Sequence, residues 1–493
     1  MQLILILRLY FISYLELKDN IFRSIQMKII KLITLCCFML VMSGCDSSTE
    51  YIVESEALPK GSPVKLMVAT DIHYLSPELV EEGPKFDNMY LSSDGKQMNY
   101  INEITEAFIE EVIEKKPDVL ILSGDLTFNG EKKSHEELAE KLRVVTDNGI
   151  RVLVTPGNHD IKNYNAIGFK YDSIYSVDNI TAKDFKNIYK DYGFNTAISY
   201  DPNSLSYVSE ISEDLWLIML DSNIYENNNI INRSEVSGEL REDTLKWLEE
   251  WLAKAESKGV TPITVMHHNL VDHNDMFNKG FTLNNSEEVC DLLNKYNVKV
   301  NLSGHIHAQS IAEKKMADGN RVTDIVTSSL SVYTNQYGMI DFLPGEKVNY
   351  STNPIDIEAW AKRNGITDEE LVNFEKYSYD FFRESSYKKA FEDLLEYEMT
   401  NEERALMAET VKELNPHYFS GTVKDVYLEI LESDSYKLWI DKGDISLRSY
   451  IDSILNGDIK DENNITIKLD KVAESFQQGN QEILFSFNVR PFH

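Results

Sequence analysis

The chain has 493 residues, of which 42% are hydrophobic and 26% are charged, and its formal net charge is −32 at pH 7. This length exceeds what one compact core normally organises, so we expect two domains of globular composition. So acidic a chain is not expected to bind nucleic acid non-specifically, because a phosphate backbone requires a basic surface. A small anionic substrate is not excluded, since bound metal ions reverse the sign of the local field.

The first 45 residues (1–45) are expected to be a targeting segment. Lys28 and Lys31 supply the positive end of an apolar stretch at 29–42, and two small residues stand directly before Cys45. This is the layout of a signal peptide, with an apolar part too short for a comfortable membrane span, and we expect translation to start at Met27. The segment MSGC resembles a bacterial lipobox, which implies a lipid on Cys45 and a protein anchored outside the cytoplasmic membrane. An uncleaved membrane anchor is the alternative, and residues 46–64 are expected to be a polar tether.

Six short apolar runs in the next part of the chain are each followed by Asp, Asn or His. Such runs are typical of strands that are buried on both faces. Helical patterns lie between them at 100–115, 135–148 and 239–257, and the second is expected to begin with a capping box of Ser134 and Glu137. Strands that alternate with helices predict an α/β architecture. The apolar runs are VKLMVAT, PDVLILSG, IRVLVTPG, LWLIML, TPITVMH and VKVNLSG.

The α/β pattern covers residues 65–345, and two insertions interrupt it. Residues 74–99 follow the first predicted strand, and the aromatic-rich residues 161–204 follow the third. A long aromatic insertion beside a site either caps a substrate or packs a small core of its own, and both interpretations stay open. Residues 346–460 have helical spacing and predict a helical accessory domain. Residues 461–493 form a tail whose two apolar runs fit a hairpin.

The polar groups that follow the predicted strands are expected to lie together, because binding groups gather beyond the carboxyl ends of strands in such sheets. Six of the ten histidines of the chain belong to this set. Imidazole and carboxylate ligands without thiolate suit Mn, Fe or Zn. Two such ions roughly 3.5–4 Å apart hold a hydroxide between them and clamp a phosphoryl group. The set consists of Asp71, His73, Asp125, Asn158, His159, His267, His268, His305 and His307.

The segments DIH, GDLTFNG, GNHD, MHH and GHIH occur in this order within residues 65–345. With these five motifs the chain resembles the calcineurin-like metallophosphoesterase family. The resemblance implies a four-layer α/β/β/α sandwich, here with an additional C-terminal helical domain, and a centre of two divalent metal ions. It implies that Asp71, His73 and His307 hold one metal, that Asp125 bridges both, and that Asn158, His267 and His305 hold the other.

The GNHD loop contributes more than a metal ligand. The resemblance implies that His159 faces the phosphate, where it stabilises charge or protonates the leaving oxygen. Asp160 either orients a ligand or closes the turn, and both readings stay open.

The remaining histidines are interpreted with less help from the motifs. The resemblance places the ligand at the first histidine of MHH, His267, so His268 is expected to lie behind the ligands. His135 is expected at the surface where a helix begins, and His273 near the substrate.

The predicted function is hydrolysis of a small phosphodiester or phosphomonoester by attack of a metal-bridged hydroxide. A diester is favoured because protein phosphatases of this superfamily carry GDxxDRG, whereas Asp125 is followed here by LTFNG, without the second Asp and the Arg. The alternative is a surface binding protein that retains a metal site without significant catalysis, a role that the acidic charge and the helical domain would suit.

Overall fold

The computed structural model describes residues 57–443 and 445–469. The predicted targeting segment with Cys45, most of the predicted tether and the second half of the predicted hairpin therefore lie outside the described residues. No helix within the described ranges is long and apolar enough to cross a membrane.

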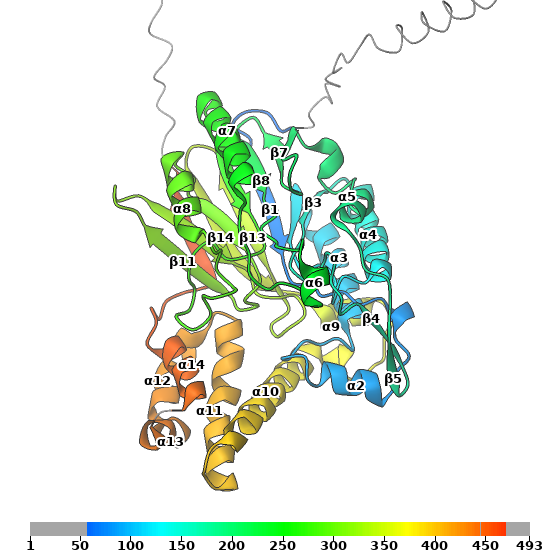
Figure 1. Cartoon of the computed structure of the whole chain (residues 1–493), viewed down its shortest axis with the longest axis vertical. Coiled ribbons are helices and arrows are strands. Elements are labelled where there is room, and N and C mark those ends of the chain that lie inside the picture. The colour runs from blue at the N-terminus through cyan, green and yellow to red at the C-terminus, as the bar shows by residue number, and fades with distance from the viewer. Residues whose placement is uncertain (1–56, 444, 470–493) are drawn as a thin grey trace, which may run out of the picture. The chain divides into compact units, whose positions relative to one another are not determined.

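Six strands form one sheet in the order β15-β14-β13-β1-β2-β3 (Figure 1). Strands β1, β2 and β3 run parallel to one another, and β13 pairs antiparallel with β1. The strands are β1 (Val64–Ala69), β2 (Val119–Ser123), β3 (Arg151–Thr155), β13 (Gln336–Leu343), β14 (Lys347–Pro354) and β15 (Asn464–Lys468).

Seven strands form the second sheet in the order β11-β12-β10-β9-β8-β7-β6. Its central strands β8, β9, β10 and β12 are parallel, so all six predicted strands are confirmed and all belong to parallel parts of the two sheets. The strands are β6 (Ser199–Tyr200), β7 (Tyr207–Ser212), β8 (Leu215–Met219), β9 (Thr261–Val265), β10 (Val300–Ser303), β11 (Ser310–Lys315) and β12 (Arg321–Val326).

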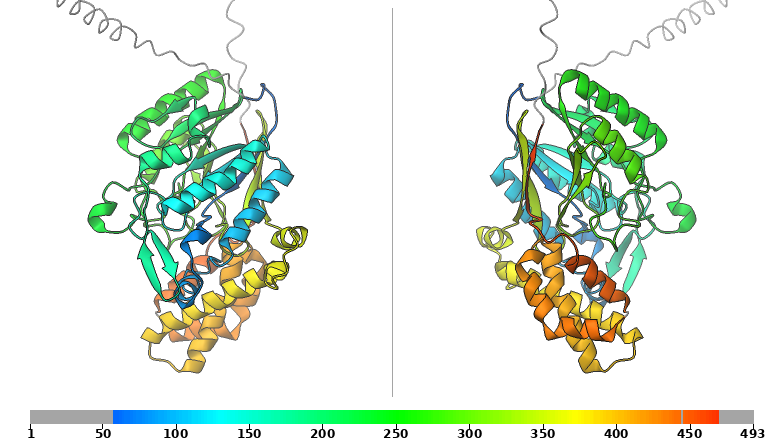
Figure 2. Two further views of the ribbon diagram at one scale, coloured as in Figure 1. Left: turned by 90° about the vertical axis from the view of Figure 1, so that its right-hand side faces the viewer. Right: turned by 90° about the vertical axis from the view of Figure 1, so that its left-hand side faces the viewer.

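Helices cover the outer face of each sheet, and the two side views show α3 and α4 on one side and α7 and α8 on the other (Figure 2). Alternation along β8 explains the layers, because Leu217 and Met219 pack between the sheets whereas Trp216 and Ile218 pack with the outer helices. The predicted four-layer α/β fold is therefore confirmed. The covering helices are α3 (Ile101–Lys115), α4 (Lys132–Asp147), α7 (Glu242–Lys258) and α8 (Ser286–Lys295).

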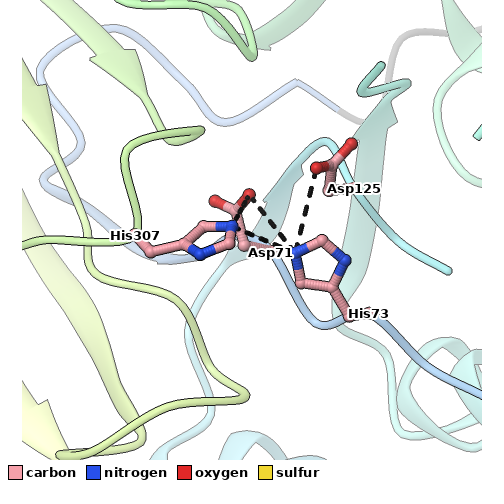
Figure 3. A group of neighbouring side chains, drawn as sticks. All are labelled: Asp71, His73, Asp125 and His307. Carbon is pink, nitrogen blue, oxygen red and sulfur yellow. Dashed lines mark hydrogen bonds and ion pairs between the residues drawn. The ribbon is translucent and has the colours of Figure 1, made fainter. Parts of the chain in front are cut away.

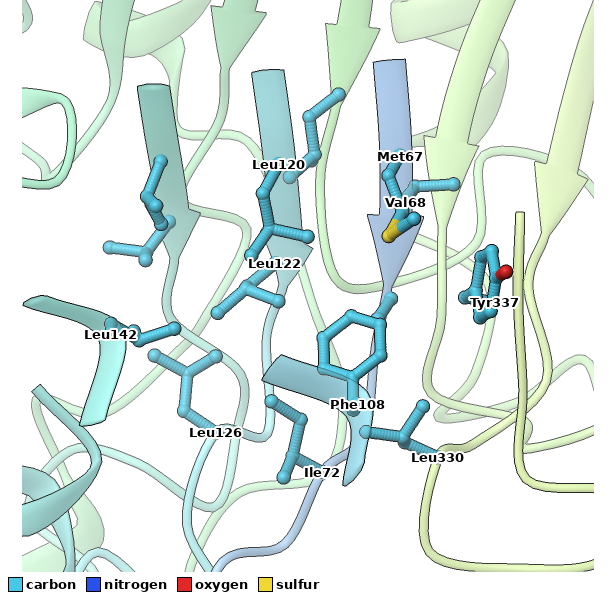
Figure 4. Packing of buried hydrophobic residues seen from close by; sticks show 14 of the residues in the cluster. Met67, Val68, Ile72, Phe108, Leu120, Leu122, Leu126, Leu142, Leu330 and Tyr337 are labelled. Carbon is cyan, nitrogen blue, oxygen red and sulfur yellow. The ribbon is translucent and has the colours of Figure 1, made fainter. Parts of the chain in front are cut away.

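The core around β1 and β2 is closely filled by apolar side chains (Figure 4). Met67 and Val68 of β1 and Leu120 of β2 are fully buried, and Phe108 of α3 closes the layer against them. Burial of this kind stabilises the fold by about 25 cal/mol for each Å² of apolar surface. The strand ends that carry the polar groups are thus anchored in the most buried part of the molecule.

The predicted capping box at the start of α4 is wrong. The helix begins at Lys132, so Ser134 lies inside its first turn. The Ser134 hydroxyl oxygen accepts a hydrogen bond from the Ser76 N–H at 3.1 Å, and the Glu137 carboxylate accepts one from the Tyr74 hydroxyl at 2.7 Å. Both side chains hold the loop after β1 instead of capping the helix.

The aromatic rings of the insertion after β3 pack into the main hydrophobic core. Phe169, Phe185 and Tyr189 are buried, and the Phe185 and Tyr189 rings lie 4.7 Å apart. This packing favours the core interpretation over the substrate cap. The elements of the two insertions and the loop that follows β8 are η1 (Pro77–Leu79), α2 (Pro84–Tyr90), β4 (Ile167–Lys170), β5 (Ser173–Ser176), α5 (Ala182–Ile188), η2 (Phe194–Thr196) and α6 (Asn228–Ile231).

The predicted C-terminal helices are confirmed, and α10 to α14 lie together as one helical group (Figure 1). They pack around Trp439, which is fully buried. The sheet extends further along the chain than the helical pattern suggested, because β14 lies at 347–354. The first apolar run of the tail forms β15 and pairs antiparallel with β14. The elements are α9 (Ile357–Arg363), η3 (Leu371–Asn373), α10 (Phe374–Asp393), η4 (Leu394–Glu396), α11 (Asn401–Phe419), α12 (Val423–Glu432), α13 (Asp434–Lys442) and α14 (Ser446–Leu455).

Candidate metal centre

The loops after five parallel strands bring the predicted site residues together. Strands β1, β2 and β3 of one sheet and β9 and β10 of the other end beside each other, as expected for the carboxyl edge of an α/β sheet. Each loop contributes one or two polar side chains. These are Asp71 and His73 after β1, Asp125 after β2, Asn158 and His159 after β3, His267 after β9, and His305 and His307 after β10.

The backbone of these loops is strained. Eleven non-glycine residues of the described chain have positive φ, and five of them belong to the predicted site. Such a conformation costs on the order of 1–3 kcal/mol per residue and persists where the surrounding structure enforces it. The five residues and their φ angles are Asp71 (51°), His73 (51°), Asp125 (47°), His305 (73°) and His307 (60°).

Two glycines allow the loops to approach closely. A Cβ atom at Gly157 would lie 2.1 Å from the backbone nitrogen of Asp125, and one at Gly304 would lie 2.6 Å from Oδ2 of Asp71. Neither position tolerates a side chain, so the PG and SG segments before the polar residues are a requirement of the site geometry.

A first group of four ligand atoms comes from Asp71, His73, Asp125 and His307 (Figure 3). The Nε2 atoms of His73 and His307 lie 3.1 Å apart, and Nε2 of His307 lies 3.3 Å from Oδ1 of Asp71. That carboxylate oxygen is buried and has no hydrogen-bond partner among the described residues. Nitrogen and oxygen lone pairs that converge around an unsatisfied buried oxygen fit a divalent cation.

A second group is formed by Asp125, His267 and His305, so Asp125 belongs to both groups. Nε2 of His267 lies 3.4 Å from Oδ1 of Asp125 and 3.1 Å from Oδ1 of Asn158. The Nδ1–H of His267 donates to the Ser123 carbonyl at 3.0 Å, which leaves Nε2 as the lone-pair atom that faces the group. The Asp125 carboxylate is thus placed between two sets of ligand atoms.

The protonation states match the needs of a metal site. Burial lowers the pKa of His73 and His307, and lowers that of His305 to about 3, so these rings are neutral at pH 7. Burial raises the pKa of Asp71, but the interactions with His307 and His267 together outweigh it and the net shift is downward. Burial lowers the pKa of His267, but Asp125, Asp71 and the Ser123 carbonyl together outweigh it and raise the pKa to about 9, so a metal would displace this proton.

His159 lies beside the two groups and keeps one nitrogen free. Its Nδ1–H donates to the Phe128 carbonyl at 2.6 Å, and its backbone N–H donates to Oδ1 of Asp125 at 2.8 Å. Nε2 lies 3.9 Å from Oδ2 of Asp125, and about a third of the side chain is exposed. The ring is therefore fixed in one orientation with Nε2 toward the open side of the centre.

Asp160 fastens the loops that carry Asp125 and Asn158. Its carboxylate accepts hydrogen bonds from the Gly157 N–H at 2.8 Å, the Leu126 N–H at 3.1 Å and the Thr127 N–H at 3.0 Å. The two interpretations of Asp160 are therefore compatible, because by closing the turn its carboxylate also positions Asn158 at the centre.

The prediction that His135 lies at the surface is wrong. His135 is fully buried, since α4 begins three residues earlier than predicted and turns this side chain inward. Its Nδ1 lies 2.9 Å from the Tyr189 hydroxyl, and its Nε2 lies 3.1 Å from both the Thr127 hydroxyl and the Asp160 carbonyl. His135 therefore connects the aromatic insertion to the loops of the centre.

His268 and His273 are held by other protein groups. Nδ1 of His268 accepts from the Ser222 hydroxyl at 2.8 Å and its Nε2–H donates to the Val236 carbonyl at 2.9 Å, so neither nitrogen is free for a metal. Its ring packs 4.5 Å from that of His305. Nε2 of His273 lies 3.1 Å from the buried Asp324 carboxylate, and the side chain is 1% exposed, so His273 supports the protein structure here.

Two residues of the centre were missed by sequence reasoning. The Thr70 hydroxyl donates to Oδ2 of Asp71 at 2.6 Å, and nothing in the sequence distinguishes this threonine from other strand residues. Lys96 lines a cavity that also reaches His305 and His307. Its only sequence signal is the Asp-Gly turn that precedes it.

Family models match both parts of the chain. Residues 64–309 match the model described as calcineurin-like phosphoesterase. Residues 356–461 match the model described as the C-terminal domain of cyclic nucleotide phosphodiesterase.

The individual proteins that resemble this chain share less than a third of their aligned residues with it. A probable cyclic nucleotide phosphodiesterase of Vesicomyosocius okutanii is 28% identical over 38% of this chain and 62% of its own length, which is less than two thirds of that relative. A probable glycerophosphodiester phosphodiesterase of Arcobacter nitrofigilis is 25% identical over 52% of this chain and 78% of its own length. A solved dimetal phosphatase from Danio rerio aligns over 59% of this chain and 97% of its own, at 11% identity and a TM-score of 0.43.

Proposed function

We propose that this chain, which carries a calcineurin-like phosphoesterase domain at residues 64–309, hydrolyses phosphodiesters at a centre of two divalent metal ions. The observation that carries the proposal is the pair of ligand groups that share Asp125. The printed names of two relatives, both phosphodiesterases, favour a diester over a monoester.

The residues divide into two metal sites. Asp71, His73 and His307 would hold one ion, and Asn158, His267 and His305 the other, with Asp125 between them. Neutral imidazoles and an amide oxygen keep the negative charge of the ligand set low, which suits an anionic substrate. When bound, the metals supply Lewis acidity and a nucleophile at neutral pH.

His159 would act as the proton donor, because the lone pairs of the metal ligands are committed to the metals. Its Nδ1–H is committed to the Phe128 carbonyl, so Nε2 is the atom that meets the substrate. A protonated Nε2 stabilises charge on the phosphoryl oxygens and donates its proton to the leaving oxygen.

The test is turnover of chromogenic phosphodiesters and phosphomonoesters by the purified full chain. We expect loss of activity after treatment with a chelator and recovery on addition of Mn²⁺, Zn²⁺ or Fe²⁺, with diesters preferred. Activity that resists the chelator would overturn the metal mechanism, and a preference for monoesters would overturn the substrate class.

The location of the enzyme is proposed from the sequence of residues 27–45. A signal peptide that ends in MSGC supports an extracytoplasmic enzyme with a lipid on Cys45. Mass spectrometry of the native N-terminus tests this assignment, and a chain that retains residues 27–44 would overturn it.

A further inference from the structure

We propose that the cavity between the metal centre and the C-terminal helices binds a planar aromatic ester group of the substrate, while Lys96 binds the phosphate at its inner end. This inference rests on the proposed function, since it names the substrate class of the same site. The cavity measures about 720 Å³, a volume typical of small-molecule sites.

The cavity is continuous with the metal centre. His305 and His307 form part of its wall. The remainder comes from the loop before α3 that carries Lys96, from the loop after β9, and from α10, η4, α11 and α14. A substrate whose phosphate lies at the metal ligands therefore has its ester group directed toward the helices.

Aromatic rings line the cavity in a nearly continuous series. The Phe281 ring lies 5.0 Å from that of His305, Phe277 lies 5.6 Å from Phe281, and Tyr450 lies 5.6 Å from Phe277. Aromatic faces stack on planar rings and offer little to a small polar alcohol such as glycerol. The rings that line the cavity are Phe277, Phe281, Phe382, Tyr397, Tyr418, Phe419 and Tyr450.

Lys96 is the unpaired cation of this cavity. Two lysines line it, and Lys389 forms an ion pair with Asp393 at 3.4 Å. Lys96 has no carboxylate within ion-pair distance in the described part of the chain, although this protein carries an excess of acidic residues. After burial, the charge of Lys96 is the next largest cause that lowers the pKa of His73 and His307, so its field reaches the metal ligands.

The backbone on both sides of Lys96 is rigidly supported. A Cβ atom at Gly95 would lie 2.4 Å from the Phe382 ring, so the turn packs directly on α10. The buried Gln97 amide donates to the Ser378 hydroxyl at 2.6 Å and its carbonyl oxygen accepts from Asn335 at 2.8 Å. The backbone of Lys96 is therefore fixed beside the cavity, which reduces the backbone entropy lost when an anion binds.

The experiment measures binding of diphenyl phosphate and dimethyl phosphate by isothermal titration calorimetry to the metal-loaded full chain with His159→Asn, a change expected to slow hydrolysis. Both diesters carry one negative charge and differ only in their ester groups. We expect diphenyl phosphate to bind at least about tenfold more tightly. Equal affinities, or no binding of diphenyl phosphate, would overturn the proposal.

Variants separate the two parts of the cavity. Phe277→Leu is expected to weaken diphenyl phosphate roughly three- to tenfold and to leave dimethyl phosphate unchanged. Lys96→Met is expected to weaken both ligands by about ten- to a hundredfold, with partial recovery in Lys96→Arg. Equal effects of Phe277→Leu on both ligands, or no effect of Lys96→Met, would contradict the assignment.

Matched controls guard against indirect effects. Lys388→Met removes an exposed lysine of α10 outside the cavity, and Tyr387→Leu removes a ring of α10 outside the cavity, so neither should change binding by more than about twofold. If Phe277→Leu does not fold, Tyr450→Leu tests the same wall. Binding of diphenyl phosphate without hydrolysis of any diester would refute the proposed function alone, whereas hydrolysis without aromatic preference would refute this inference alone.

Discussion

Asp71 and Asp324 are both fully buried carboxylates that lie beside a histidine, but the numbers of hydrogen bonds that they accept differ. Both oxygens of Asp324 accept hydrogen bonds, with donors in the loop after β9 and in strand β10. The donors are the N–H groups of Leu270 and Val271, the imidazole of His273, the amide of Asn301 and the hydroxyl of Ser303.

Asp71 receives donors on one oxygen only. Oδ2 accepts from the Thr70 hydroxyl and the His305 N–H, whereas Oδ1 has no donor in the described structure. A buried acceptor without a partner costs on the order of 1–3 kcal/mol, so it is retained where a ligand satisfies it. The comparison teaches that donor count, more than residue type, distinguishes a structural Asp–His pair from a metal-binding one.

The largest predicted effect tests the metal-binding side of this comparison. Asp125→Ala removes the carboxylate shared by both ligand groups and is expected to lower kcat/KM by at least about 10³-fold, because rate enhancements of hydrolases exceed 10⁶. Metal content, measured by mass spectrometry, should fall with it. Full activity of this variant would show that the shared carboxylate is not part of the centre.

The next prediction separates metal binding from proton transfer within the centre. His159→Asn keeps a polar side chain beside Asp125 but lacks an ionisable nitrogen, so kcat should fall by about 10²-fold at unchanged metal content. Loss of bound metal in this variant would instead make His159 a ligand.

The third prediction tests the structural side. Asp324→Asn keeps the side-chain shape but replaces one acceptor oxygen with a donor that faces other donors. We expect the free energy of unfolding to fall by about 2 kcal/mol, measured by urea titration, with metal content and kcat of the folded protein preserved. A loss of metal would show that the two networks are coupled.

Much of the fold was predictable because buried strands can be identified in the sequence by their hydrophobic pattern. The six parallel strands are continuous apolar runs that end in polar residues, such as VLILS before Asp125. The same alternation of strands with helices predicted which side chains would meet, since parallel strands end at one edge. The structure brings together the predicted set of strand-end residues on this basis.

What escaped prediction depends on contacts between distant parts of the chain. His135 resembles a surface residue because its neighbours are charged, and only the insertion that supplies Tyr189 buries it. Lys96 resembles a turn residue until Phe382, nearly three hundred positions later, packs against Gly95. The roles of Asp324 and Asp71 likewise follow from donor groups on other loops.

The last prediction concerns a third buried Asp–His pair, His135 and Asp160. This pair lies beside the metal centre without belonging to either ligand group. Burial lowers the pKa of His135 from 6.5 to about 3 in the folded protein. The unfolded chain therefore takes up a proton on this residue below pH 6.5 that the folded chain does not, and the wild type loses stability as the pH falls. Relative to His135→Gln, this loss should reach about 1.4 kcal/mol per pH unit below 6.5, measured as the difference in unfolding free energy at pH 7.5, 6.0 and 5.0. Asp160 and Tyr189 are present beside position 135 in both proteins, so their titration largely cancels when the two unfolding free energies are subtracted. A difference in unfolding free energy that does not change with pH would show that His135 is not buried in its neutral form.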